Sequence, residues 1–247
     1  MTSSNEKDDD CLVILNYGFF YDIAFCRPGD TAWSELKDRM VPVGVWPSRN
    51  QMAYSSKDKT LYCKFREFAI EGLHDVSNPD SEWELVIPDM YEDFSVLKRY
   101  YSPQYLAMNE SSGDLLLVHR NMGRWLTGGY LVENEKPTHN EWLADKTYKF
   151  DVYKVNCEEQ KLEWVNCLDD RVIFLGLNHC FCLSANDFPG LTPNSIYFTD
   201  DVPRDSYPGH IDMGFFIMEG RRMRTFIHDH METVARLRWV APCNIPI

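Results

Sequence analysis

Short apolar runs separated by turn residues fill the region between residues 164 and 201, WVNCLDDRVIFLGLNHCFCLSANDFPGLTPNSIYFTDD. Residues 172–175 (VIFL) and 196–198 (IYF) are β-branched and aromatic, and residues 180–183 (CFCL) alternate small and large apolar side chains between them. Proline fixes φ and glycine tolerates positive φ, so Pro189-Gly190 marks a turn. The pattern predicts three short strands joined by tight turns, with no helix of ordinary length.

The same pattern recurs along most of the chain. Residues 52–54 and 61–63 flank the polar segment SSKDKT, which is typical of a hairpin. We expect further hairpins at 149–155 with 161–165 and at 211–218 with 223–227, and single strands at 11–15, 19–26, 33–36 and 115–118. One segment differs: Met90, Phe94, Leu97 and Tyr101 have helical spacing, which predicts either a short helix or an irregular insertion. Residues 122–145 are expected to include a long loop.

Polar turn residues precede a tryptophan and an apolar run at three places. These tryptophans, Trp33, Trp83 and Trp164, are separated by 50 and 81 residues. Evenly spaced short strands indicate a sandwich, a barrel or a propeller. The tryptophan spacings are near one and two propeller blades of about 40–45 residues each, so the recurrence favours the propeller.

Several segments resemble blade motifs of the plant F-box-associated, KIB-type β-propeller family: 24–33 (AFCRPGDTAW), 111–118 (SSGDLLLV), 150–155 (FDVYKV) and 175–191 (LGLNHCFCLSANDFPGL), which continues to 194–201 (NSIYFTDD). The resemblance implies an all-β, propeller-like fold of about five four-stranded blades, as a closed or an incomplete ring, with at most one or two short helices. We expect an acidic disordered tail at 1–10 and one propeller domain at 11–247.

Members of this family usually begin with an F-box, a helical motif that docks a Skp-type adaptor of a ubiquitin ligase. In this sequence the blade motif at 24–33 follows the acidic start directly. We therefore expect a non-enzymatic protein-interaction propeller that resembles the substrate-recognition part of such ligases but does not itself bind a Skp-type adaptor. If the ring is incomplete, exposed strand edges would favour self-association.

Charge and composition exclude several classes of partner. The formal net charge is −13, which opposes nucleic-acid binding through phosphates and docking on anionic lipid. The acidic start resembles neither a secretory signal nor a transit peptide, so we expect a cytoplasmic or nuclear protein. Eight scattered cysteines without a CxxC pair are expected to be mostly small buried apolar residues rather than a disulfide framework.

Candidate chemistry is sparse. Cys180 and Cys182 would face one way on a strand, which favours core packing over half of a zinc site. A metal site would need His228 and His230 to meet His210 and Asp212. An acidic cluster, Asp200, Asp201 and Asp205, underlies the competing hypothesis, a carbohydrate-binding or hydrolytic propeller with a carboxylate-lined central site. We expect no catalytic residues, cofactor or metal.

Aromatic and arginine side chains in predicted loops carry the hypothesis of partner binding, because Trp, Tyr and Arg are enriched at interaction hot spots. The alternative is that each tryptophan fills a gap between blades. The candidate partner-binding residues are Arg27, Trp46, Arg124, Trp125, Trp142 and Tyr207.

Overall fold

The computed structural model describes residues 12–17, 22–36, 51–64, 69–76, 78, 81–88, 103–126, 143–176, 180–199 and 212–226, with backbone only at 16, 22, 51, 124–126 and 143–145. Within these ranges the regular structure is β throughout, apart from the 3-10 turn η3 (Glu219–Arg221). The all-β class predicted from the sequence is confirmed. Among the described residues, no helix has the length and apolar composition needed to span a bilayer.

Two small sheets come first in the chain. β1 (Val13–Tyr17), β2 (Asp22–Cys26) and β3 (Ser34–Glu35) form an antiparallel three-stranded sheet. A four-stranded meander follows, the length of one propeller blade, made of β4 (Gln51–Ser55), β5 (Thr60–Lys64), β6 (Ile70–His74) and β7 (Trp83–Ile87). The predicted hairpin around SSKDKT is the pairing of β4 with β5.

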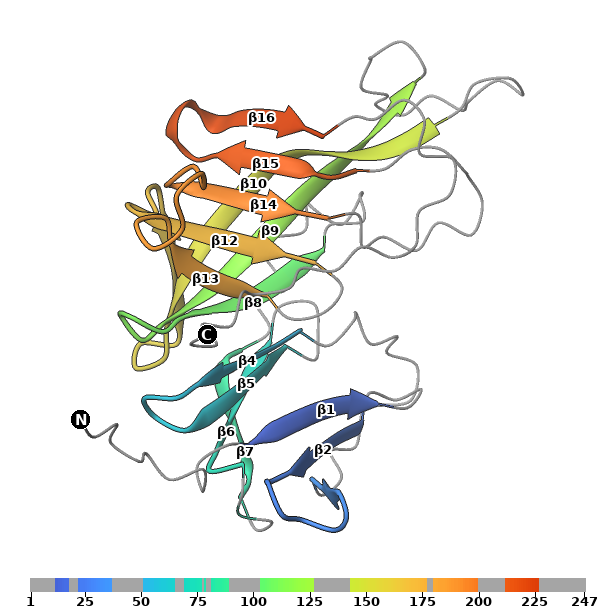
Figure 1. Ribbon diagram of the computed structural model, residues 1–247, viewed down its shortest axis with the longest axis vertical. Helices are drawn as coiled ribbons and strands as arrows, with labels where there is room; N and C mark the ends of the chain where they lie inside the picture. Colours follow the sequence, from blue (N-terminus) through green and yellow to red (C-terminus); the bar gives the residue numbers. More distant parts are fainter. Residues whose placement is uncertain are drawn as a thin grey trace, which may run out of the picture.

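The largest sheet has nine strands. Its first half is a second four-stranded meander, β8 (Gln104–Asn109), β9 (Asp114–Leu126), β10 (Leu143–Asn156) and β11 (Lys161–Val165). Its second half contains β12 (Arg171–Leu175), β13 (Phe181–Ser184), β14 (Ser195–Phe198), β15 (Gly214–Ile217) and β16 (Arg222–Thr225). β13 joins β8, and the sheet curls so that β12–β16 lie in front of β9 and β10 (Figure 1).

Alternating side chains stack these sheets face to face. In β5, Leu61 packs against the first sheet, with Ile23 and Phe25, whereas Tyr62 packs on the opposite side, with Leu106 of β8. In β8 itself, Leu106 faces β4–β7 and the neighbouring Tyr105 faces the core beneath β12–β16. The meanders β4–β7 and β8–β11 are therefore covered on both faces, as blades of a propeller are.

Some elements differ from the sequence prediction. The long loop expected at 122–145 is shortened, because β9 extends to Leu126 and β10 begins at Leu143. β6 and β8 were not predicted, since IEGLH and QYLAMN contain glycine, alanine, glutamine and methionine rather than a β-branched alternation. The tail at 1–10 and the helical pattern at 90–101 lie outside the described residues.

Candidate functional site

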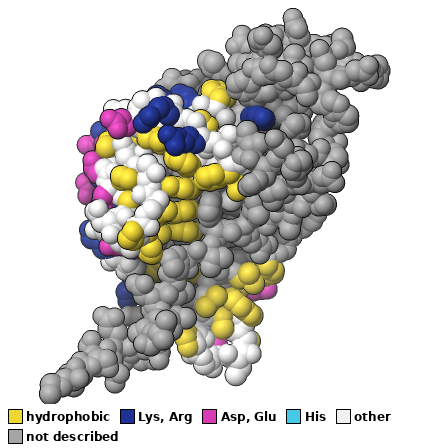
Figure 2. Space-filling view, turned by 45° about the horizontal axis from the view of Figure 1, so that its top comes forward, with side chains coloured by type: hydrophobic (Ala, Val, Ile, Leu, Met, Phe, Trp, Pro, Cys, Tyr) yellow, Lys and Arg dark blue, Asp and Glu magenta, His cyan; other side chains and the backbone are white. Residues whose placement is uncertain are grey.

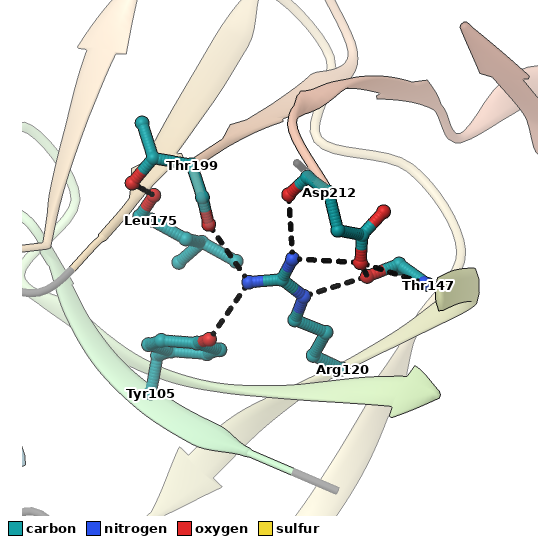
Figure 3. A network of polar contacts seen from close by, with 6 residues as sticks. All are labelled: Tyr105, Arg120, Thr147, Leu175, Thr199 and Asp212. Carbon is teal, nitrogen blue, oxygen red and sulfur yellow. Dashed lines mark hydrogen bonds and ion pairs between the residues drawn. The ribbon is translucent and has the colours of Figure 1, made fainter. Parts of the chain in front are cut away.

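A buried arginine joins the two halves of the nine-stranded sheet. Arg120 on β9 is completely buried, and its guanidinium is enclosed by polar groups from four segments of the chain (Figure 3). Nε donates to Thr147 Oγ1 at 2.7 Å, and Nη1 donates to the Tyr105 hydroxyl at 3.2 Å and the Thr199 carbonyl at 2.9 Å. Nη2 donates to the backbone carbonyl and to Oδ2 of Asp212, both at 3.0 Å.

All five N–H groups of this guanidinium thus have an acceptor. Asp212 Oδ2 also accepts from the backbone N–H of Thr147 at 2.7 Å and from its hydroxyl at 2.6 Å. The Arg120 guanidinium carbon lies 4.8 Å from the centre of the Phe198 ring. The network ties β8, β9 and β10 to the segments that follow β14 and precede β15, so its role is structural. The metal-site hypothesis for Asp212 does not fit this environment, because its carboxylate is paired with an arginine.

A second charged cluster lies at the open edge of β10. The buried carboxylate of Asp151 pairs with Lys149 Nζ at 2.7 Å and Arg221 Nη2 at 2.8 Å, and it accepts a bond from Asn121 Nδ2 at 2.9 Å. Arg221 Nη2 also donates to the carbonyl of Phe150 at 3.1 Å. β11 pairs only with Val152–Asn156 of β10, which leaves this carbonyl available to Arg221.

The turn between β15 and β16 places Arg221 there. Gly220 and Arg221 both have positive φ, 69° and 51°, as a tight turn between twisted strands requires. A non-glycine residue in this conformation costs about 1–2 kcal/mol. The ion pair with Asp151 offsets that cost and holds the tip of the β15–β16 hairpin against β10.

An exposed tryptophan lies beside these two cations. Trp164 on β11 is 43% exposed, with Arg221 at 5.7 Å and Lys149 at 5.9 Å from the centre of its ring. The Tyr153 ring meets it edge-on at 5.2 Å, and the indole N–H donates to the side-chain oxygen of Asn166. We call Lys149, Tyr153, Trp164 and Arg221 the Trp164 surface.

Burial sets the ionisation of two groups near this surface. It raises the pKa of the Tyr153 hydroxyl to about 12, with a further contribution from the Asp151 carboxylate, so this tyrosine stays neutral. Burial lowers the pKa of His119 on β9 to about 4; Asp151 opposes the change, and Lys64 and Lys149 add to it. His119 is therefore neutral at pH 7, and the fixed charges of the surface are those of Lys149, Asp151 and Arg221.

The candidate partner-binding residues do not form one described site. Arg27 is exposed in the turn after β2, where its N–H donates to Asp30 Oδ2 at 2.8 Å. Arg124 and Trp125 lie within β9, paired with Asp145 and Ala144 of β10, rather than in a loop as expected. The other three candidates, Trp46, Trp142 and Tyr207, lie outside the described residues.

The prediction of mostly buried cysteines holds for Cys63, which is 0% exposed, and for Cys180 and Cys182, and it fails at two turn residues. Cys180 is buried in the core of the nine-stranded sheet and Cys182 packs against the same core, as their spacing predicted. Cys157 and Cys167 are exposed turn residues, so not all cysteines are core residues. Within the described ranges no three metal-binding side chains converge. Asp200, Asp201, Asp205, His210, His228 and His230 lie outside those ranges.

Sequence reasoning missed the Trp164 surface because its members come from three separate elements. In the sequence, Trp164 was singled out only as one of three recurring tryptophans, and Arg221 only falls between the two strands expected at 211–218 and 223–227. The only local signal was the alternation of side chains along β11. Trp164 lies two residues after Leu162 and therefore on the same face of the strand, but Leu162 packs against the core whereas Trp164 is exposed. No spacing rule connects that position with residues 149 and 221.

Comparison with known proteins adds relatives to this geometry. The family model described as KIB1-4 beta-propeller matches residues 1–217. A putative F-box protein of Arabidopsis thaliana is 23% identical over 248 residues, which cover 100% of this chain and 60% of that protein.

Two further matches are shorter. An F-box protein from the same plant is 47% identical over 57 residues, which cover 22% of this chain and 13% of that protein. Another putative F-box protein of that plant is 41% identical over 95 residues, which cover 38% of this chain and 24% of that protein. The chain thus spans 60% of the length of the first relative and smaller shares of the other two. No solved structure matches the chain.

Proposed function

This chain belongs to the KIB1-4 beta-propeller family, and we propose that it is a non-enzymatic protein-interaction module that recognises a protein target through the Trp164 surface. The relatives that it matches are F-box proteins. In this role the chain corresponds to the substrate-recognition part of such a protein. Its own residues do not bind a Skp-type adaptor directly.

The exposed indole of Trp164 between two cations is the observation that carries the proposal. Tryptophan and arginine dominate interaction hot spots, because a large flat ring and a planar guanidinium bury much area with few rotatable bonds. Here both cations are already positioned by Asp151, so little side-chain entropy remains to be lost on binding.

Charge indicates the chemistry of the target. Two cations around one carboxylate leave a local positive excess on a chain whose net charge is −13. An acidic segment would be guided to this patch and repelled elsewhere. The expected target is therefore a protein that presents an apolar or aromatic side chain to Trp164, with carboxylates on either side facing Lys149 and Arg221.

The test begins by finding proteins that the purified chain crosslinks in plant extract through a photoreactive residue at Tyr148, which is exposed next to Lys149. Each purified candidate is then titrated against the wild type, Trp164→Ala, Arg221→Ala and the matched control Trp33→Ala, at a tryptophan that lies just before β3 and is 48% exposed. We expect both Trp164→Ala and Arg221→Ala to weaken binding at least tenfold and the control to leave it unchanged.

Equal affinities for all four proteins would contradict the proposal. Two further mixtures test its other parts. Binding of the purified chain to a Skp-type adaptor alone would contradict the expectation that the adaptor is not engaged directly. Saturable binding of an oligosaccharide, with no effect of Trp164→Ala, would favour the carbohydrate-binding alternative instead.

A further inference from the structure

The nine-stranded sheet ends at a short basic strand. β16 is the last strand in the order of that sheet and pairs with β15 alone among the described strands. In Figure 1 it is the outermost strand at the top of the molecule. Arg222, Arg224 and Thr225 on this strand are exposed, and Met223 is partly exposed. One edge of β16 is therefore open to solvent.

Alternation along β16 determines which backbone groups point to that edge. The N–H of Phe226 donates to the carbonyl of Met213 at 2.9 Å, which makes these two residues a hydrogen-bonded pair of the β15–β16 ladder. Hydrogen-bonded and non-hydrogen-bonded pairs alternate in an antiparallel ladder, and the register along β16 is regular. Met223 and Thr225 belong to non-hydrogen-bonded pairs, so their N–H and C=O groups point away from β15.

The outward groups of Met223 and Thr225 form no hydrogen bond with any described residue. An edge strand with unpaired N–H and C=O groups is a template for another extended chain, which adds to the sheet through main-chain hydrogen bonds. The open edge of β16 thus offers two N–H and two C=O groups to an added strand.

Two unpaired cations mark this edge. Arg222 and Arg224 are two residues apart, so their side chains share one face of the strand, and neither forms an ion pair with a described carboxylate. Cations on the neighbouring strands of the sheet differ in this respect. Lys149, Lys154 and Lys161 of β10 and β11 each contact a carboxylate.

The local charge is positive on an acidic chain. Three arginines and one glutamate give residues 214–226 a formal charge of +2, whereas the whole chain carries −13. Nearby Lys149 and Asp151 of β10 pair with each other and so cancel. Figure 2 shows basic side chains gathered at the upper end of a column of apolar side chains. An acidic segment would be attracted to this edge and repelled by most of the remaining surface.

An aromatic side chain follows the two arginines on the same face. Phe226 is 42% exposed, and its ring centre lies 5.7 Å from that of Phe215 on β15. Arg224 lies over the same Phe215 ring, 5.9 Å from its centre. Arg222, Arg224 and Phe226 therefore present two cations and one apolar ring at alternate positions.

A second copy of β16 does not fit this edge. Like charges directly opposite each other destabilise a pair of strands, and two copies of β16 would bring four arginines together. Charged side chains protect edge strands from pairing with themselves in this way. The same arginines favour a different segment that carries carboxylates at matching positions.

We propose that β16 binds an extended acidic segment of another protein as an added strand. The backbone of the segment pairs with Met223 and Thr225. Two carboxylates at alternate positions meet Arg222 and Arg224, and an apolar side chain at the next alternate position meets Phe226. An antiparallel segment has the apolar residue before the acidic ones in its sequence, and a parallel segment has it after them.

The probe is a fluorescein-labelled peptide, TTFTDTDTT, titrated with the full chain and followed by fluorescence anisotropy. Its reversed sequence, TTDTDTFTT, tests the parallel orientation. Two control peptides are TTFDDTTTT, which has the same composition but places its carboxylates on both faces of a strand, and TTFTKTKTT, which reverses the charge. We expect one of the first two peptides to bind saturably and both controls to bind about tenfold or more weakly.

Variants of the chain locate the bound segment. Arg222→Glu/Arg224→Glu should weaken binding about tenfold or more, whereas Arg27→Glu/Lys57→Glu, the same change of charge at two exposed residues of other elements, should have little effect. Thr225→Pro removes an outward N–H that β15 does not use, and it should weaken binding about fivefold or more. Thr225→Val keeps that N–H and should bind as the wild type does. Circular dichroism checks that each variant is folded.

Several results would overturn the proposal. One is the absence of saturable binding of both designed peptides up to about 1 mM, the weak end of specific affinity. Another is equal binding of TTFDDTTTT, because the attraction would then not need a paired strand. Equal losses in the two charge-reversed proteins, or an equal loss in Trp164→Ala, would place the segment elsewhere. A wild-type dimer that Thr225→Pro dissociates would show that another copy of the chain occupies the edge.

Discussion

Arg120 and Asp212 form an ion pair 3.0 Å apart although 92 residues separate them, and their side chains are 0% and 2% exposed. A buried pair of this kind adds little compared with a well-packed apolar core, because both charges lose their hydration. Loss of one partner is different, since the remaining charge is then buried without compensation. Removal of either partner should therefore weaken the packing of β12–β16 on β8–β10 by more than the intact pair adds to it.

Asp212→Ala should lower the free energy of unfolding by about 3–5 kcal/mol, measured by urea denaturation at pH 7. Three donor groups lose their acceptor together: one N–H of Arg120 Nη2, the backbone N–H of Thr147 and the Thr147 hydroxyl. Asp114→Ala, which removes the partly exposed pair with Lys154 at 2.6 Å, is the control and should cost less than about 1 kcal/mol. Similar losses in the two variants would show that the Arg120 network does not hold the halves together.

The free energy of unfolding should fall as the pH is lowered, because His119 is buried in its neutral form. Its pKa in the folded protein is about 4, below the ordinary histidine value of 6.5, so between these values the unfolded chain binds more protons. The stabilising contribution is complete above pH 6.5 and is lost as the pH falls toward 4. From pH 7 to pH 5 the loss is about 2 kcal/mol.

The comparison of His119→Gln with the wild type isolates this contribution from the carboxylates, which titrate in both proteins. The variant should lose about 2 kcal/mol less than the wild type between pH 7 and pH 5 in chemical denaturation. Parallel curves for wild type and His119→Gln would contradict the assigned shift.

The sequence could predict most of the strands and little of the site, for a physical reason. Local alternation identifies a strand and its inward side, as at Cys180 and Cys182, and the polar turn between residues 54 and 61 identifies a hairpin. β8 was missed because QYLAMN has no β-branched residue and becomes a strand only through pairing with β9. The resemblance to a propeller family supplied the stacking of sheets that alternation alone leaves open.

The polar clusters were beyond local reasoning. Thr147 lies 27 positions after Arg120 and Asp212 lies 92 positions after it, and no spacing rule reaches that far. Asp212 was considered for a metal site because histidines lie near it in sequence, but its partner in space is an arginine. Arg124 and Trp125 were placed in a loop because of nearby glycines, whereas the pairing of β9 with β10 extends through them.

Two substitutions of Asn194 should separate the contribution of its backbone conformation to stability from that of its side-chain hydrogen bond. Its φ is 53°, and its side-chain oxygen accepts from the N–H of Leu168 at 2.8 Å. Asn194→Gly keeps the backbone conformation and loses the bond, which should cost about 1 kcal/mol. Asn194→Ala loses both and should cost about 1–2 kcal/mol more. Thermal and urea unfolding check the order, and equal costs for the two variants would show that the positive φ carries no strain.

Gly214 at the start of β15 should tolerate no side chain without a shift of the backbone. A Cβ there would collide with the carbonyl oxygen of Arg224 and lie 2.9 Å from the Cα of Thr225. Both atoms belong to the backbone of β16, which pairs with β15, so relief requires the two strands to separate. We expect Gly214→Ala to cost about 3 kcal/mol or more.

The matched control for that substitution is Gly29→Ala. Gly29 has a φ of +94° and no atom within 4 Å of an added Cβ, so only backbone strain of about 1–2 kcal/mol applies. Hydrogen exchange should show where the difference arises, because separation of β15 from β16 exposes the amides of 214–217 and 222–225 in Gly214→Ala and not in Gly29→Ala. Equal stability losses, or unchanged exchange in the hairpin, would mean that the close approach of the two strands is not required by the fold.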